Sequence, residues 1–239
     1  MKSTVSLWAL VLSLGLTLFV SPAYCQDLGG GVATKENLDL PFDSIGESEE
    51  EEDAPEIVTF YGQQLEGDGI FYVIDRSSSM GDRGELAIAK TELARNITEF
   101  SERVEFGMVF FDQGIKMYPS NGQPATAGVG MKASAMSFVQ ATQAGFGSCC
   151  QQGLAKILRM ANMATAKRKV IVYLGDGRGH CQGGDENQYL KQTLSAITAQ
   201  NYQRIPINCI MVLDVTAVGE DFLKRLSTAN GGTYSVKIR

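Results

Sequence analysis

Histidine is almost absent from this sequence, with His180 alone in 239 residues. This scarcity excludes a zinc enzyme that holds its metal with several histidines, and it leaves a Ser-His-Asp hydrolase a single imidazole to use. The sequence supplies neither a third residue to orient His180 nor an oxyanion-hole motif. We therefore expect that this protein is not an enzyme.

A surplus of positive charge is also lacking, because 21 basic residues face 27 acidic ones and the net charge is −6. This balance argues against a general nucleic-acid-binding protein. The short basic cluster Lys167-Arg168-Lys169 precedes an expected strand, and a solvated turn explains it better than a contact with nucleic acid. We therefore expect no nucleic-acid partner.

The N-terminus carries the one long apolar run of the sequence. Lys2 provides a positive charge, residues 7–20 are almost wholly apolar, and Ser21-Pro22-Ala23-Tyr24-Cys25 offers small residues for cleavage. This pattern predicts a signal peptide over residues 1–25 and a secreted or periplasmic protein. An uncleaved N-terminal membrane tether is the alternative, although the run is short for a spanning helix.

Residues 26–56 form a segment rich in acidic residues. They begin with Gly29-Gly30-Gly31 and contain the acidic run Glu47-Ser48-Glu49-Glu50-Glu51-Glu52-Asp53. Such a block repels itself and buries no apolar surface, so we expect a disordered acidic linker. A tether for cations or for a basic partner is the alternative interpretation.

Strand and helix patterns alternate from residue 57 onward, which we take as the start of a folded domain over residues 57–239. Apolar stripes at helical spacing include Leu86, Leu93 and Ile97, and further stripes begin at Leu154 and Leu190. The expected strands cover residues 70–74, 104–111, 115–118, 170–174, 205–213 and 233–238. The alternation predicts an α/β fold: a doubly wound, mostly parallel six-stranded sheet, Rossmann-like, with helices on both faces.

Oxygen-bearing side chains follow two of these strands. Asp75, Ser77 and Ser79 form the motif Asp-x-Ser-x-Ser after the first strand, and Asp176 follows the strand at residues 170–174. Parallel strands end at the same edge of a sheet, so these residues should lie together there. Carboxylate and hydroxyl oxygens suit a hard divalent cation, whereas the alternative is that Asp and Ser cap backbone groups in a turn.

The Asp-x-Ser-x-Ser motif resembles the metal-ion-dependent adhesion site (MIDAS) of von Willebrand factor type A (VWA) domains. The resemblance covers roughly residues 66–239 and extends to Asp176, in the place of the aspartate in the family's third loop. The family's second loop supplies a threonine before a helix, and here Ser148 stands in that position. The resemblance thus implies a metal site made of Asp75, Ser77, Ser79, Ser148 and Asp176, holding Mg²⁺ or else Mn²⁺ or Ca²⁺.

The resemblance also implies a function. The cation of such domains keeps a coordination position open for an acidic residue of a protein or peptide partner, so we expect a metal-dependent binding module. Ser148 keeps the hydroxyl of threonine but lacks the methyl group that restricts χ1, so the site could be less preorganised. The alternative is an interaction scaffold that no longer depends on metal.

Cysteines flank two of the site loops. Cys149-Cys150 directly follows Ser148, and His180-Cys181 follows Asp176 by a few residues. One interpretation is a disulfide from Cys149 or Cys150 to Cys181 that holds the two loops together. A zinc site of three thiolates and one imidazole, or free packed thiols, are the alternatives. Cys209 lies in an apolar strand, where we expect it to be buried.

Overall fold

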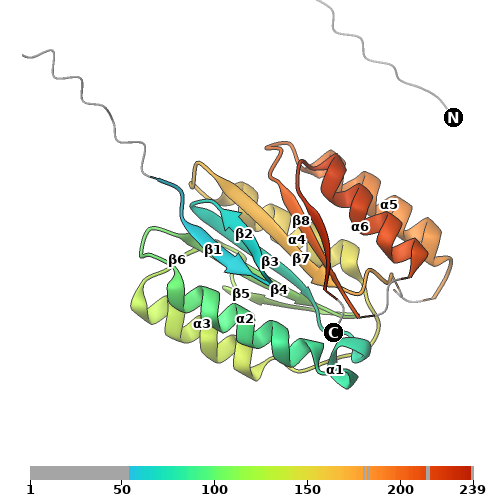
Figure 1. Cartoon of the computed structure of the whole chain (residues 1–239), viewed down its shortest axis with the longest axis horizontal. Coiled ribbons are helices and arrows are strands. Elements are labelled where there is room, and N and C mark those ends of the chain that lie inside the picture. Colours follow the sequence, from blue (N-terminus) through green and yellow to red (C-terminus); the bar gives the residue numbers. More distant parts are fainter. Residues whose placement is uncertain (1–53, 180, 182, 214–215, 238–239) are drawn as a thin grey trace, which may run out of the picture. The chain divides into compact units, whose positions relative to one another are not determined.

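The computed structural model describes residues 54–179, 181, 183–213 and 216–237. The expected signal peptide, most of the expected linker and His180 lie outside these residues. The described chain forms an α/β domain with one main sheet, a separate two-stranded hairpin and six helices (Figure 1). The expected α/β fold is confirmed. None of the helices in the described part of the chain has the length and apolar character needed to cross a bilayer.

The main sheet has the strand order β5-β4-β3-β7-β8-β9. Strand β3 lies parallel to both β4 and β7, β8 lies parallel to β7, and β9 lies parallel to β8. The strands of this order are β3 (Gly69–Asp75), β4 (Glu105–Phe111), β5 (Ile115–Tyr118), β7 (Lys169–Gly175), β8 (Ile207–Val212) and β9 (Tyr234–Lys237). The two-residue strand β6 (Ala125–Thr126) and β5 both pair antiparallel with β4.

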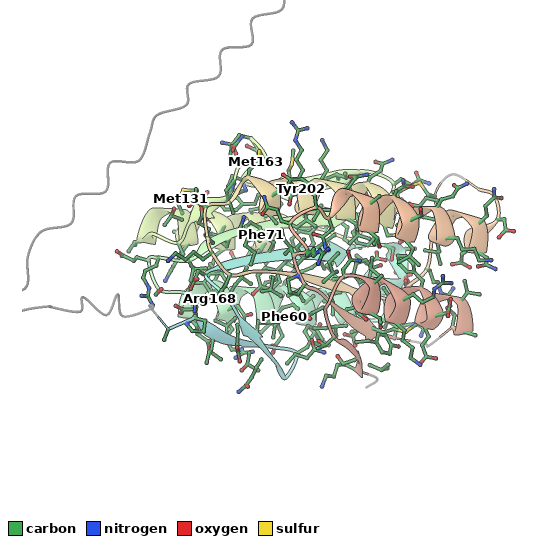
Figure 2. All side chains as sticks on the ribbon, turned by 90° about the horizontal axis from the view of Figure 1, so that it is seen from above. Phe60, Phe71, Met131, Met163, Arg168 and Tyr202 are labelled. Atoms are coloured by element: carbon green, nitrogen blue, oxygen red, sulfur yellow. A yellow bond between two sulfur atoms is a disulfide. The ribbon has the colours of Figure 1, made fainter. Side chains whose placement is uncertain are left out.

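Strand β3 is buried along its whole length because it lies in the middle of the sheet with core on both faces. Successive side chains of a strand point to opposite faces. Tyr72 therefore joins the core that contains Phe60, whereas Phe71 and Val73 join the core on the other face. Figure 2 shows Phe60 and Phe71 on the two sides of the sheet.

Three helices cover each face of the sheet. The first face carries α1 (Ser78–Asp82), α2 (Glu85–Glu99) and α3 (Val129–Ala141), and the second carries α4 (Cys150–Met163), α5 (Glu186–Gln200) and α6 (Ala217–Ala229). The hairpin of β1 (Ile57–Phe60) and β2 (Gln63–Glu66) also packs on the first face. Asn96 of α2 anchors it: its side chain donates to Thr59 O at 2.7 Å and accepts from Tyr72 Oη at 2.8 Å.

The six expected strands are all present, with ends that differ by at most two residues. Strand β6 makes the sheet seven-stranded rather than six-stranded. The hairpin and the helices α1, α3 and α6 were not expected either. In α3 only Ala135 and Val139 are fully buried, so the helix presents a weak apolar stripe, and the strands of the hairpin are four residues long.

Candidate metal site

The carboxyl ends of β3 and β7 bring the five expected oxygen donors together. Asp75 is the last residue of β3, and Asp176 follows the last residue of β7, its parallel neighbour. Ser148 lies just before α4, whose N-cap is Cys149. Hydrogen bonds connect Asp75, Ser77, Ser79, Ser148 and Asp176 across the three loops: three run between side chains, and one runs from the backbone N–H of Ser77 to Asp75.

The first loop reaches the third through its two serines. The Ser77 N–H donates to Asp75 Oδ1 at 2.7 Å, which is the turn-capping bond that the alternative interpretation expects. The hydroxyls have a different use: Ser77 Oγ and Ser79 Oγ lie 3.0 Å apart, and Ser79 Oγ donates to Asp176 Oδ2 at 2.8 Å. Ser77 is the N-cap of α1, yet its hydroxyl makes no capping bond within the described residues. The serine side chains thus face the carboxylates rather than the helix.

The hydroxyl of Ser148 connects the second loop to both of the others. Its oxygen lies 3.0 Å from Asp75 Oδ2 and 2.9 Å from the carbonyl oxygen of Arg178. A hydroxyl has one hydrogen, so it satisfies one of these acceptors at a time, while its lone pairs stay available to a cation. Ser148 is 3% exposed, and this loop position is therefore shielded from bulk water.

Two carboxylates meet at this edge with little compensating charge. Burial, and next the neighbouring charge of Asp176, raise the pKa of Asp75 to about 7, although hydrogen bonds from Ser77 and Ser148 act in the opposite direction. The guanidinium Nε of Arg178 lies 3.9 Å from Asp176 Oδ2 on a side chain that is 43% exposed. Such an exposed pair offsets little of the negative charge. The site therefore favours binding either a proton or a cation.

The ion pair of Arg76 and Asp112, which was not identified from the sequence, lies at the same edge of the sheet. Asp112 follows β4, and its Oδ1 lies 2.8 Å from the guanidinium of Arg76, with both side chains mostly buried. The backbone of Arg76 accepts from Gly145 N, and that of Asp112 accepts from Cys149 N. A Cβ on Gly145 would lie 1.8 Å from Asp112 Oδ2, so a side chain has no room there. Like Asp75, Asp112 lies at the carboxyl end of a buried parallel strand, and this position in the sequence could have revealed Asp112 as part of the edge.

A disulfide joins Cys149 to Cys181 and so links the second and third loops. The prediction of a bond to Cys181 is confirmed, and its partner is Cys149 rather than Cys150. The zinc alternative is wrong, because the disulfide uses two of the three thiolates that it needs. Cys150 and Cys209 are free and buried. Burial raises the pKa of the Cys150 thiol to about 12, which keeps it protonated and a poor nucleophile.

The donor set fits a hard divalent cation by its chemistry. All five side chains offer oxygen, and two carry negative charge that the protein leaves largely uncompensated. The described residues contain no group of three or more histidine, cysteine, aspartate or glutamate side chains that could hold a metal ion. A site of two carboxylates and three hydroxyls does not form such a cluster, and it contains no soft ligand that would select zinc or copper.

Comparisons with known proteins place this architecture among VWA domains. No protein-family model matches the sequence, and no curated protein matches it. A von Willebrand factor type A protein from Catenulispora acidiphila superposes with a TM-score of 0.62 at 21% identity, over 71% of this chain and 38% of that one. The chain thus spans well under half of that protein.

Two pilus proteins have the same fold at lower identity. The vWF domain of the type V pili tip protein Mfa5 from Porphyromonas gingivalis gives a TM-score of 0.54 at 14% identity, over 70% of this chain and 89% of that one. The PilB minor pilin from Streptococcus sanguinis gives a TM-score of 0.55 at 13% identity, over 72% of this chain and 56% of that one. At these identities the likeness establishes that the chain has the VWA fold.

Proposed function

We propose that this protein is an exported binding module that engages a protein or peptide through a divalent cation held at the carboxyl edge of the sheet. The observation that carries the proposal is the convergence of five oxygen donors from three loops around two buried carboxylates. The occurrence of the same fold in a pilus tip protein and a minor pilin supports a binding role. Mg²⁺ is the cation that we propose, with Mn²⁺ or Ca²⁺ as substitutes.

The five residues have two roles in this proposal. The hydroxyl oxygens of Ser77, Ser79 and Ser148 would contact the cation, while Asp75 and Asp176 accept hydrogen bonds from serines and so orient them. With two carboxylates in the set, a bound divalent cation would remain an acceptor for a further anionic ligand. That ligand would be an aspartate or glutamate side chain of the partner.

Export and the absence of catalysis belong to the same proposal. The Cys149–Cys181 disulfide supports an oxidising compartment, since such bonds persist in secreted and periplasmic proteins. The free thiol of Cys150 is buried and protonated, which makes it unsuited to covalent catalysis. We propose binding rather than chemistry at this edge.

Substitution of Ser148 tests whether the second loop contributes a ligand. Ser148→Ala removes the hydroxyl and should weaken Mn²⁺ binding on the order of 10-fold or more, whereas Ser148→Thr keeps the hydroxyl and should retain binding. Isothermal titration with Mn²⁺ measures both variants. The matched control is Ser227→Ala, which removes another buried hydroxyl, one that bonds to Lys224 O in α6. Equal affinity in Ser148→Ala and the native protein would remove Ser148 from the site.

The raised pKa of Asp75 predicts that the stability of the metal-free protein and the additional stabilisation by Mg²⁺ change in opposite directions with pH. The pKa is about 7 in the folded protein against an ordinary value of 3.8, so the folded state binds more protons between these two pH values. The free energy of unfolding in chelator should therefore fall as pH rises from about 4 to about 7. The additional stabilisation by Mg²⁺ should grow over the same interval, because protons compete with the cation for the carboxylate. Denaturant titrations across this range measure both trends, and a Mg²⁺ effect that is independent of pH would contradict the prediction.

A scaffold that works without metal is the second candidate. This candidate is favoured because the hydroxyls of Ser79 and Ser148 already donate to acceptors within the protein. The disulfide gives such a scaffold a fixed loop surface. A partner recovered in Mg²⁺ separates the two candidates: release by excess chelator supports the metal-dependent module, and retention supports the scaffold.

A further inference from the structure

A positively charged groove lies at the amino edge of the sheet, opposite the candidate metal site. Its volume is about 440 Å³, and four of its lining residues are cationic: Lys167, Arg168, Lys169 and Arg204. The groove lies where β7 begins, at Lys169, and Pro55 forms part of its wall. Figure 2 shows Arg168 at the end of the domain where β1 begins.

Most of this positive charge lacks an acidic partner. Arg168 pairs with Asp68 at 3.1 Å, and Lys169 Nζ is held by two neutral oxygens, those of Ala164 and Gln203. Among the described residues, no carboxylate lies within ion-pair distance of Lys167, Lys169 or Arg204. Glu66 is the one acidic residue in the lining, so the groove keeps a net positive charge.

The chain itself contains a segment of complementary charge that is close in sequence to a wall residue of this groove. Glu49, Glu50, Glu51, Glu52 and Asp53 are five consecutive acidic residues, and Asp53 precedes the wall residue Pro55 by two positions. Five residues reach about 17 Å when extended, which is enough to follow a groove of this size. A segment tethered at this distance has an effective concentration on the order of millimolar at the groove.

We propose that the segment Glu49–Asp53 binds in this groove as an intramolecular acidic ligand and covers its cations. An acidic segment from another protein would then have to displace it before it could use the same surface. Exposed ion pairs are individually weak and are screened by salt, because the Debye length falls from about 10 Å at 0.1 M to about 3 Å at 1 M. The segment should therefore occupy the groove at low salt and leave it at high salt.

Zero-length carbodiimide cross-linking of the protein, read by mass spectrometry, tests the proposal. At low salt we expect cross-links from Glu49–Asp53 to Lys167 and Lys169, and we expect their loss near 1 M salt. An equal mixture of isotopically light and heavy protein shows whether the cross-linked acidic segment belongs to the same chain as the groove or to a second copy. Cross-links within one chain support the proposal, whereas mixed-label cross-links would show that a second copy fills the groove and would overturn it.

Charge reversal supplies the specificity control. Lys167→Glu together with Arg204→Glu should abolish the cross-links to Lys169. The matched variant Lys156→Glu with Arg159→Glu reverses two exposed cations of α4 and should leave them unchanged. Adding Glu50→Lys and Glu51→Lys to the first variant should restore cross-linking, now between the amines introduced in the segment and the carboxylates introduced in the groove. Equal loss in both reversal variants, or no rescue, would overturn the proposal.

Discussion

Replacing Asp75 with asparagine should have two opposite effects: the metal-free protein becomes more stable, and its stabilisation by Mg²⁺ disappears. Asparagine has nearly the shape of aspartate and keeps a carbonyl oxygen that can accept the 2.7 Å bond from Ser77 N. The substitution therefore changes charge more than geometry. Thermal melts in excess chelator and in Mg²⁺ measure both effects.

The gain in the metal-free protein follows from the electrostatics of Asp75. Its side chain is fully buried, and burial together with the charge of Asp176 raises its pKa to about 7. Above that pH the folded protein must hold a buried carboxylate beside a second one without a strong counter-charge. Asparagine removes the desolvation and the repulsion, so the midpoint in chelator should rise at pH values above about 7.

The loss of the metal response follows from the same residue. A cation at about 100 times its dissociation constant stabilises a protein by roughly 2.7 kcal/mol. Removal of one of the two carboxylates lowers both the negative charge of the site and the acceptor strength that orients Ser148. We expect the shift in Mg²⁺ to vanish in Asp75→Asn, and also in Asp75→Ala, which removes the side chain altogether.

Asp112→Asn is the matched control for this experiment. Asp112 is also a mostly buried carboxylate after a strand at this edge, but Arg76 neutralises it at 2.8 Å. Its replacement leaves a buried guanidinium without its partner, so the protein should lose stability in chelator while keeping a response to Mg²⁺. A Mg²⁺ shift in Asp75→Asn equal to that of the native protein would refute the metal site. The absence of any Mg²⁺ shift in the native protein would favour the metal-independent scaffold.

The positions of Asp75 and Asp176 could be predicted because two simple patterns determine them. Continuous apolar runs identify β3 and β7 as buried parallel strands, and parallel strands place their following residues at one edge. The placement of Ser148 relied on the resemblance to VWA domains, and the structure brings it within 3.0 Å of Asp75. The hydrogen bonds among the donors needed the structure, because they depend on loop conformation.

Other features could not be read from the sequence, for physical reasons. Cys149 and Cys150 are adjacent, so spacing cannot show which of them faces Cys181; the turn into α4 decides it. Helix α3 carries few fully buried residues, which leaves little 3.6-residue periodicity to detect. The pair of Arg76 and Asp112 joins two loops that are far apart in sequence, and its role depends on where those loops meet.

Removing the disulfide should lower both the stability of the protein and its affinity for metal. Cys149 and Cys181 are 32 residues apart in the sequence, and a loop of that length gives a chain-entropy contribution of roughly 3–4 kcal/mol. The double variant Cys149→Ala with Cys181→Ala should lose about this much free energy of unfolding in chelator. Denaturant titration measures the loss, and Cys209→Ala, which removes a free buried thiol, should lose less.

The effect on metal affinity shows whether the disulfide positions the loops of the metal site or only stabilises the fold. Cys149 adjoins Ser148, and Cys181 lies on the loop whose Arg178 carbonyl accepts from the Ser148 hydroxyl at 2.9 Å. Without the covalent link, the bond from Ser148 to Arg178 O still joins the second loop to the third, while the bond from Cys149 N to Asp112 O holds the second loop to the loop after β4. Mn²⁺ titrations of the double variant should therefore show weaker binding than those of Cys209→Ala. If stability falls while Mn²⁺ affinity stays the same, the disulfide supports the fold alone, and the position of Ser148 is set by the Arg76–Asp112 pair.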